Sequence, residues 1–282
     1  MKFHMSTAEI FVPDGLPVEQ ALTRTTHMCI SAHQDDIEIM GARPILDCFQ
    51  QKELWFTGVV VTDGRGSPRD DLYKDYTDEE MRLVRFKEQK KAAVVGEYAV
   101  QVLLDFPSKI VKDPSKLEPV ADIAALLKIA QPKYVYTHNL ADKHDTHVAV
   151  TRRVINAIRS LSEGERPEKL YGCEVWRDLD WMVDEDKIAF DLTKHESLQT
   201  ALLGVFDSQI CGGKRYDLAS MGRRRANATY FASHGVDLTS GLSYGMDLTP
   251  LIIDNNRSVT EFMQEYIQRF TADVIARLER AG

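Results

Sequence analysis

Short apolar runs alternate with helical patterns over the first 161 residues, and this alternation limits the fold more than any other feature. Runs of strand length lie at 28–31, 55–61, 100–104 and 133–137, and helical patterns follow them at 39–51, 77–95, 119–130 and 148–161. Such an order predicts a parallel sheet with helices on both faces. Residues 55–61 are apolar almost throughout, as is typical of a strand buried on both faces. We therefore predict an α/β fold with a Rossmann-like, mostly parallel sheet.

The pattern becomes less regular after Gly164. We predict strands at 170–176 and 187–191, a helix at 194–206 and a last helix at 259–280, which a capping box at Ser258 and Glu261 would open. The stretch 209–246 is rich in Gly, Ser, Asn and Arg and gives no clear element. No Pro-, Gly- or Ser-rich linker interrupts the chain. We therefore expect one domain over 1–282, with a core at about 27–210 and a C-terminal elaboration at 211–282.

The composition narrows the classes of partner. A formal net charge of −8 argues against nonspecific nucleic-acid binding, which depends on phosphate neutralisation by Lys and Arg. No apolar run approaches the roughly 20 residues of a membrane span, and residues 1–26 lack a signal-peptide layout. The four cysteines are scattered and form no C-x-x-C pair. We expect a cytoplasmic protein with a small-molecule substrate, and a homo-oligomer remains an open alternative.

Two polar clusters follow the first and the fourth predicted strands. The first comprises His33, Asp35 and Asp36, and the second His138, Asp142, His144, Asp145 and His147. Because parallel strands end at one edge of a sheet, both clusters should lie where such sheets bind ligands. Imidazole nitrogen and carboxylate oxygen together suit zinc. Taken alone, each cluster is also explained as a solvated turn with a helix cap. The chain has only eight histidines, so their concentration at one edge favours a metal site.

Several motifs of the chain are similar to those of one known family. Ala32–Glu38 matches A-H-P-D-D-x-E after a first strand, Thr62–Gly64 matches T-D-G, Arg85–Glu88 matches R-x-x-E and His144–His147 matches H-P-D-H. A Lys-containing helix that ends in Ser-Gln is matched by 194–209. On these motifs the chain resembles the PIG-L/LmbE-like family of zinc-dependent N-acetylglucosamine deacetylases over about 28–209.

The resemblance implies a role for each matched residue. His33, Asp36 and His147 would bind one Zn²⁺ per chain, although another divalent ion is an open alternative, and Asp35 would be the general base. His144, if protonated, would donate a hydrogen bond to the oxyanion. Candidate substrate-binding residues are Arg85, Asp63 and Asp105. Arg85 is equally well explained as a surface arginine paired with a neighbouring Glu, and the two aspartates as turn residues.

Two positions depart from the family pattern. Gln34 replaces the proline of the first motif, and because proline fixes φ, the loop should be less rigid here. Thr146 replaces the aspartate of H-P-D-H. A carboxylate that would orient a metal ligand is therefore absent, or is supplied by Asp142 or Asp145.

These observations predict a zinc-dependent hydrolase that removes acetyl from an N-acetylglucosamine-type sugar or conjugate, with Asp35 as general base for the attacking water. The alternatives are a catalytically inactive sugar-binding module and a zinc amidohydrolase for another small amide. The first predicted strand is followed by His and Asp rather than G-x-G-x-x-G, which argues against a Rossmann dehydrogenase. We expect 65–75 and the C-terminal elaboration to form the pocket for the aglycone.

Overall fold

A computed structural model describes all residues, 1–282, and contains one eight-stranded sheet with the order β1-β4-β3-β2-β5-β6-β8-β7. The strands are β1 (Glu9–Phe11), β2 (His27–Ser31), β3 (Phe56–Thr62), β4 (Val100–Phe106), β5 (Tyr134–His138), β6 (Lys169–Cys173), β7 (Ile188–Asp191) and β8 (Leu242–Asp247). The central strands β4-β3-β2-β5-β6 are parallel. β1 runs antiparallel to β4, and β8 runs antiparallel to both β6 and β7. The predicted mostly parallel α/β sheet is confirmed.

The direction in which the strands are added reverses beside β2. From β2 the chain builds β3 and β4 on one side, then crosses to build β5 and β6 on the other. β2 pairs directly with β5 in parallel, with His27 opposite Tyr134 and Cys29 opposite Tyr136. In open α/β sheets, ligands bind at such a switch point, outside the carboxyl ends of the strands. Both polar clusters of the sequence leave the sheet at this point.

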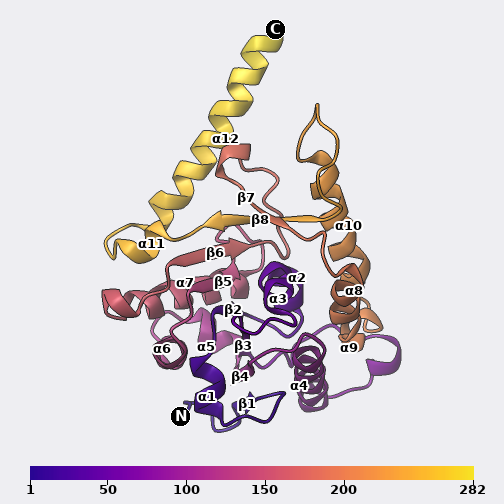
Figure 1. The fold of residues 1–282 in the computed structure, drawn as a ribbon, viewed down its shortest axis with the longest axis vertical. Helices are drawn as coiled ribbons and strands as arrows, with labels where there is room; N and C mark the ends of the chain where they lie inside the picture. The colour runs from indigo at the N-terminus through magenta and orange to yellow at the C-terminus, as the bar shows by residue number, and fades with distance from the viewer.

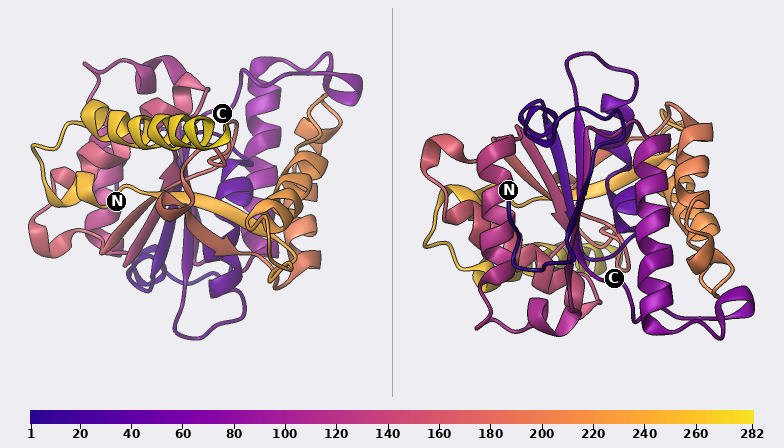
Figure 2. Two further views of the ribbon diagram at one scale, coloured as in Figure 1. Left: turned by 90° about the horizontal axis from the view of Figure 1, so that it is seen from above. Right: turned by 90° about the horizontal axis from the view of Figure 1, so that it is seen from below.

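Helices cover both faces of the sheet (Figure 2). The longer ones are α4 (Asp78–Val95), α6 (Glu118–Ala130), α7 (Asp145–Arg159), α8 (Glu196–Gly204), α10 (Tyr216–Tyr230) and α12 (Val259–Ala281). The shorter ones are α1 (Val18–Thr23), α2 (Asp36–Met40), α3 (Ala42–Cys48), α5 (Ser108–Lys112), α9 (Asp207–Ile210) and α11 (Pro250–Ile253), together with the 3₁₀ turns Asp71–Tyr73, Glu163–Glu165 and Asp184–Asp186. None of the helices is both long and apolar enough to cross a membrane.

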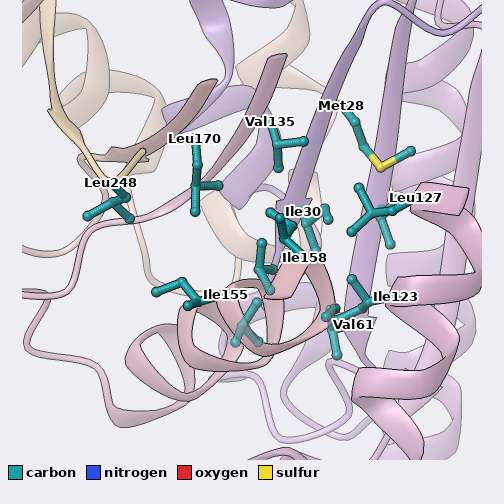
Figure 3. Close-up of a cluster of buried hydrophobic side chains, with 14 of the residues drawn as sticks. Met28, Ile30, Val61, Ile123, Leu127, Val135, Ile155, Ile158, Leu170 and Leu248 are labelled. Carbon is teal, nitrogen blue, oxygen red and sulfur yellow. The ribbon is translucent and has the colours of Figure 1, made fainter. Parts of the chain in front are cut away.

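The alternation of side chains along β2 separates two apolar cores. Met28 and Ile30 point into a core shared with residues of α6 and α7, including Leu127 and Ile158 (Figure 3). Cys29 points to the other face, into a core that includes Phe86 of α4. Because β2 is buried on both faces, its position and register are strongly specified. The loop that follows β2 therefore starts from a rigid base.

Three predicted elements need correction. The helix expected at 39–51 begins at Asp36 and is divided at Gly41 into α2 and α3. A Cβ at Gly41 would lie 2.8 Å from the carbonyl oxygen of Ile37 and 3.1 Å from Cys29 Sγ, so the break requires glycine. The helix expected at 148–161 begins at Asp145, one turn earlier. The stretch 209–246, where we expected no element, contains α10 and β8.

Arg224 joins α10 to the loop region of the site. Its buried guanidinium donates hydrogen bonds to the carbonyls of Glu38 (2.9 Å) and Ile39 (3.1 Å), at the end of α2. The neighbouring Arg223 donates to the carbonyl of Val175, and Arg225 pairs with Glu196. The three consecutive arginines therefore serve three separate structural contacts, and the C-terminal elaboration supports the helix that carries Asp36.

Candidate metal centre

Three side-chain atoms from the two polar clusters converge at the switch point. His33 Nδ1 lies 3.2 Å from Asp36 Oδ2 and 3.2 Å from His147 Nε2, and His147 Nε2 lies 3.3 Å from the same Asp36 oxygen. His33 and Asp36 come from the loop after β2 and the first turn of α2, and His147 comes from the first turn of α7. The structure thus brings the three predicted ligands together in a nearly equilateral triangle, although His33 and His147 are 114 residues apart in the chain.

The size of this triangle fits a tetrahedral zinc ion. With ligand distances of about 2.0–2.1 Å, tetrahedral geometry separates neighbouring ligands by about 3.3–3.4 Å, close to the observed 3.2–3.3 Å. The donor set of two imidazoles and one carboxylate also matches the protein ligands of catalytic zinc sites. The residues therefore fit the ion that their chemistry implies.

Asp142 orients His147. Its Oδ2 accepts a hydrogen bond from His147 Nδ1 at 3.3 Å and another from the backbone N–H of Trp176 at 3.2 Å. A carboxylate only accepts, so the proton of His147 lies on Nδ1 and the Nε2 lone pair points into the triangle. This carboxylate–histidine arrangement accompanies most metal-binding imidazoles. Of the two alternatives that the sequence left open, Asp142 makes this contact, and Asp145 is exposed on the surface of α7.

The buried charges of the triangle depend on one another. Burial opposes ionisation of Asp36, but the imidazoles of His147, His138 and His33 hold its pKa below the usual range. Burial likewise disfavours the charged form of His147, yet Asp36 and Asp142 raise its pKa above the ordinary value. The nitrogen and oxygen atoms of His33, Asp36 and His147 that point at one another are all hydrogen-bond acceptors unless protonated. Without an ion, at least one of them must therefore carry a proton. A bound cation would take the place of that proton.

His138 lies beside the triangle but is unsuited to be a ligand. It is fully buried at the end of β5, and its Nε2 accepts a hydrogen bond from the backbone N–H of Ala32 at 2.8 Å. The lone pair that would face Asp36, 3.6 Å away, is therefore already engaged. Its ring stacks on that of His147 with centroids 3.9 Å apart, so it supports the ligand from the side.

Asp35 occupies a strained position next to the triangle. Its φ of 96° lies in a region that non-glycine residues rarely adopt, and such conformations cost roughly 1–3 kcal/mol and cluster at functional sites. Its backbone N–H donates to Gln89 Oε1 at 3.2 Å, and Arg85 Nη2 lies 3.4 Å from its carboxylate. Burial raises the pKa of Asp35 well above the ordinary value, while Arg85 opposes this shift.

Arg85 is a buried residue of α4, so its explanation as a surface arginine paired with a glutamate is wrong. Besides Asp35, its guanidinium donates to the carbonyl of Gln34 and to the hydroxyl of Ser67. Gln34, in place of the family proline, is itself fixed, since its side-chain amide donates to the carbonyl of Thr62 at 3.2 Å. The loop therefore gains from hydrogen bonds part of the rigidity that proline would provide.

His144 lies at the N-cap of α7, half-buried, with its ring stacked on His147 at a centroid distance of 4.5 Å. Burial and the neighbouring charges of His147 and His33 lower its pKa to about 4. The expectation that His144 donates in its protonated form therefore needs correction. At neutral pH it is a neutral imidazole, which still carries one N–H to donate.

A cavity of about 490 Å³ opens above these residues. Most of its lining residues are polar or charged, and the lining comprises His33, Asp35, Asp36, Gly64, Gly66, Ser67, Pro68, Arg85, Ser108, Lys112, His144, Thr146, Trp176, Gln209, Lys214 and Tyr216. We expected 65–75 and the C-terminal elaboration to line the pocket. Of these two segments, the residues that line the cavity are Gly66, Ser67, Pro68, Lys214 and Tyr216. Trp176 and Tyr216, which meet edge to face at 6.0 Å, carried no motif in the sequence.

Comparison with protein families gives one match. Residues 28–158 match the family described as PIG-L: GlcNAc-PI de-N-acetylase. This match supports the resemblance of the chain's motifs to the PIG-L/LmbE-like family. The matched segment contains the metal triangle, Asp35, His144 and Asp142. A comparison with curated proteins by sequence found no match.

Solved structures of low sequence identity share the fold. The N,N′-diacetylchitobiose deacetylase from Pyrococcus horikoshii, in complex with its inhibitor MPG, is 15% identical, with a TM-score of 0.62 over 84% of this chain and 88% of that one. The conserved protein TT1542 from Thermus thermophilus is 16% identical, with a TM-score of 0.61 over 83% and 100%. GalB, the 4-carboxy-2-hydroxymuconate hydratase from Pseudomonas putida, is 14% identical, with a TM-score of 0.58 over 79% and 96%. Since deacetylases and a hydratase share this fold, the fold alone does not specify the reaction.

The remaining PIG-L motifs serve as supports in this structure. Glu88 of R-x-x-E accepts hydrogen bonds from the backbone N–H (2.7 Å) and hydroxyl (2.6 Å) of Ser208, which places the adjacent Gln209 at the cavity wall. Glu38 accepts from Tyr98 at 2.7 Å and from Gln89 at 2.9 Å, and burial raises its pKa to about 8. These contacts tie α2, α4 and α9 together around the site.

Asp63 and Asp105 do not reach the cavity, contrary to our expectation of substrate contacts. Asp63 is held by Arg65, whose Nε lies 2.7 Å from its carboxylate. Asp105 forms a two-pronged pair with Arg82, at 2.7 and 2.6 Å. Both carboxylates are buried and paired with these arginines, and neither lines the cavity. We therefore leave them out of the site.

Proposed function

We propose that this protein is a zinc-dependent N-deacetylase that removes the acetyl group from an N-acetylated amino sugar or its conjugate. The observation that carries the proposal is the triangle of His33, Asp36 and His147, sized for zinc, with the carboxylate of Asp35 beside it at the floor of a polar cavity. The PIG-L family match supports the same reaction.

Each residue around the ion would have its own role in the reaction. His33, Asp36 and His147 would hold zinc, which when bound makes water more acidic and polarises a carbonyl oxygen. Asp35 accepts the proton of the attacking water, and its burial and raised pKa keep that proton available for the leaving amine. Arg85 restrains the Asp35 carboxylate. His144, neutral at pH 7, donates an N–H towards the oxygen on which negative charge develops.

The cavity also suits a sugar. Ser67, Ser108 and Gln209 offer hydroxyl and amide groups for hydrogen bonds with ring hydroxyls, and Trp176 offers a flat aromatic surface. A volume of about 490 Å³ lies within the roughly 300–1,000 Å³ range of small-molecule sites. It leaves room for an aglycone beyond a single amino sugar.

An acetate-release screen tests the proposal. Purified protein, stripped of metal or supplied with zinc, would be incubated with N-acetylglucosamine, its glycosides, thiol-precursor conjugates and diacetylchitobiose. We expect zinc-dependent acetate release from at least one of them. Protein that binds sugar without retaining an ion would instead be a binding module, and release only from unrelated amides would move the activity to another substrate class.

Asp35→Asn sharpens the test, because it removes the base without changing shape. It should retain zinc and the fold but lose turnover by about 10²–10⁴-fold. Asp145→Asn, an exposed change next to His144, is the matched control and should turn over normally. If Asp35→Asn loses zinc while Asp36→Asn retains it, the two carboxylates have been assigned in reverse.

A further inference from the structure

Two cations without carboxylate partners line the cavity. Lys112 lies at the end of α5 and Lys214 lies between α9 and α10, and neither has a carboxylate oxygen within 4.0 Å of its ammonium. The ammonium of Lys214 lies 5.1 Å from the centroid of the Trp176 ring, which keeps it beside the aromatic wall.

The acidic groups that line the cavity already have other partners. The only carboxylates among the lining residues are Asp35 and Asp36. Asp36 belongs to the metal triangle and Asp35 is paired with Arg85. A zinc ion would add further positive charge at the floor. The outer wall therefore favours a ligand that brings negative charge of its own.

We propose that the substrate carries an anionic group, a phosphate or a carboxylate, which Lys112 and Lys214 bind while the N-acetyl group reaches the metal triangle. This inference rests on the proposed deacetylase function. A substrate of this kind spans the cavity, with its sugar ring against Trp176. The lysines then act as specificity determinants that select charged conjugates over neutral sugars.

The test compares neutral and anionic probes on the zinc-loaded protein. N-Acetylglucosamine is the neutral probe, its 1- and 6-phosphates carry a phosphate, and N-acetylmuramic acid carries a carboxylate. We expect kcat/KM for at least one anionic probe to exceed that for N-acetylglucosamine about tenfold or more, and the ratio to fall with ionic strength. Which probe is preferred distinguishes phosphate from carboxylate.

Substitution of the two lysines tests whether they cause the preference for anionic probes. Lys112→Gln and Lys214→Gln should each reduce the anionic-to-neutral ratio about tenfold, whereas Lys109→Gln, an exposed lysine of the same helix α5 that does not line the cavity, should keep it. Equal kcat/KM for neutral and anionic probes, or a ratio unchanged in both lysine variants, would overturn the inference.

Calorimetric titration with the preferred anionic probe separates this inference from the proposed function. If no probe releases acetate, the deacetylase proposal fails. Binding that weakens about tenfold in Lys112→Gln and Lys214→Gln but not in Lys109→Gln still supports an anion subsite, and binding of equal strength in all of these proteins refutes it.

A separate observation concerns α12, which extends from the body of the molecule towards its free C-terminal end (Figure 1). Only Phe262 and Tyr266 of this 23-residue helix are buried. Further along, a stripe of apolar side chains at helical spacing is 38–67% exposed, namely Ile267, Phe270, Val274, Ile275 and Leu278. The root of this stripe borders an apolar groove of about 460 Å³ lined by Leu140, Ala141, Arg177, Trp181, Met263, Ile267 and Phe270.

The exposed stripe has about the apolar area that a self-interface needs. With roughly 150–250 Å² for a large side chain, the exposed fractions amount to about 400 Å² of apolar surface per copy. A standard interface of about 800 Å² per partner is about 57% apolar, or roughly 450 Å². Glu261 lies in the first turn of α12 and Arg280 in its last turn. Antiparallel pairing would bring the Glu261 end of one copy towards the Arg280 end of the other.

We infer that two copies of this chain dimerise through antiparallel α12 helices, with Leu278 of each copy near Ile267 and the groove of the other. Ile267 and Leu278 are separated by about 16 Å along the helix, so the two-fold axis passes near the midpoint of the stripe. Such pairing is closed, because each copy presents the same surface.

Sedimentation velocity tests the dimer. We expect a dimer for the wild type and for Ala272→Glu, which lies on the opposite side of α12, and a monomer for Leu278→Glu. Under oxidation, Thr271→Cys near the axis should crosslink two copies, and Leu278→Cys should not, since antiparallel pairing separates those positions. A wild-type monomer, or a dimer that survives Leu278→Glu, would overturn the inference. Crosslinking through Leu278→Cys would overturn the antiparallel arrangement.

Discussion

Replacement of Asp142 by asparagine should weaken zinc binding although Asp142 is not itself a ligand. Its Oδ2 accepts from His147 Nδ1 (3.3 Å) and Trp176 N (3.2 Å), and its Oδ1 accepts from His144 N (3.0 Å). An asparagine side chain has one acceptor oxygen and one NH₂ group. Whichever way the amide is turned, at least one of these N–H groups faces another donor, and His147 loses a charged acceptor.

The size of the effect follows from that lost contact. A hydrogen bond to a charged group contributes about 1.5–3 kcal/mol, and each 1.4 kcal/mol or so, at about room temperature, changes a dissociation constant tenfold. Zinc affinity should therefore fall by about 10–100-fold, in the range known for carboxylates that orient metal-binding histidines. The hydrogen bonds from the backbone N–H groups of Trp176 and His144 to residue 142 also weaken. The free energy of unfolding of the metal-free protein should therefore fall as well.

Competition with a chromophoric zinc chelator measures the affinity, and thermal unfolding of the metal-free protein measures the second effect. Asp145→Asn is the control, because Asp145 is exposed, three residues from Asp142, and has no side-chain partner in the structure. Its zinc affinity should equal that of the wild type. If Asp142→Asn binds zinc as tightly as the wild type, or if Asp145→Asn weakens it instead, the assignment of the orienting carboxylate is wrong.

Two further predictions concern His144 and Glu174. His144→Ala should retain zinc and lower kcat about 10²–10³-fold, more than it raises KM; its rate profile above about pH 6 should keep the wild-type shape, because a pKa of about 4 leaves His144 neutral there. A variant with the wild-type rate would exclude His144 from catalysis. Burial raises the pKa of Glu174 to about 6, so the folded state holds its proton more tightly than the unfolded state. This group therefore contributes stability below about pH 4.5, which is lost as the pH rises through about 6, by about 2 kcal/mol in total. Urea unfolding at about pH 4.5 and about pH 7 should show that loss in the wild type and not in Glu174→Gln; equal pH dependence in both proteins would contradict it.

Much of the sheet could be predicted because the strands that position the site are continuous apolar runs. β2, β3, β4 and β5 were each located to within a few residues by composition alone. The antiparallel β8 and the helix α10 were missed for a physical reason. The residues that α10 buries include Arg224 and Asn227, which are polar, so no apolar stripe marks it. Their partners, Glu38 and Glu174, lie far away in the chain.

The sequence could predict which side chains lie close together at the site, but not which of them are paired with other residues. The carboxyl ends of parallel strands lie at one edge of the sheet, so His33, Asp36 and His147 were expected to lie close together as metal ligands. Asp63 and Asp105 also follow strands, yet Arg65 and Arg82 engage them, and nothing in the spacing reveals this. Trp176 and Lys214 reach the cavity from irregular segments without periodicity or motif. Only their three-dimensional position identifies them.

Anomalous diffraction from zinc-soaked crystals would show directly whether His33, Asp36 and His147 hold a zinc ion. We expect one zinc peak per chain within about 2.0–2.2 Å of His33 Nδ1, Asp36 Oδ2 and His147 Nε2, and no peak at that place in His147→Ala crystals at the same zinc concentration. The absence of a peak between these three atoms in the wild type, or a peak held by other side chains, would contradict it.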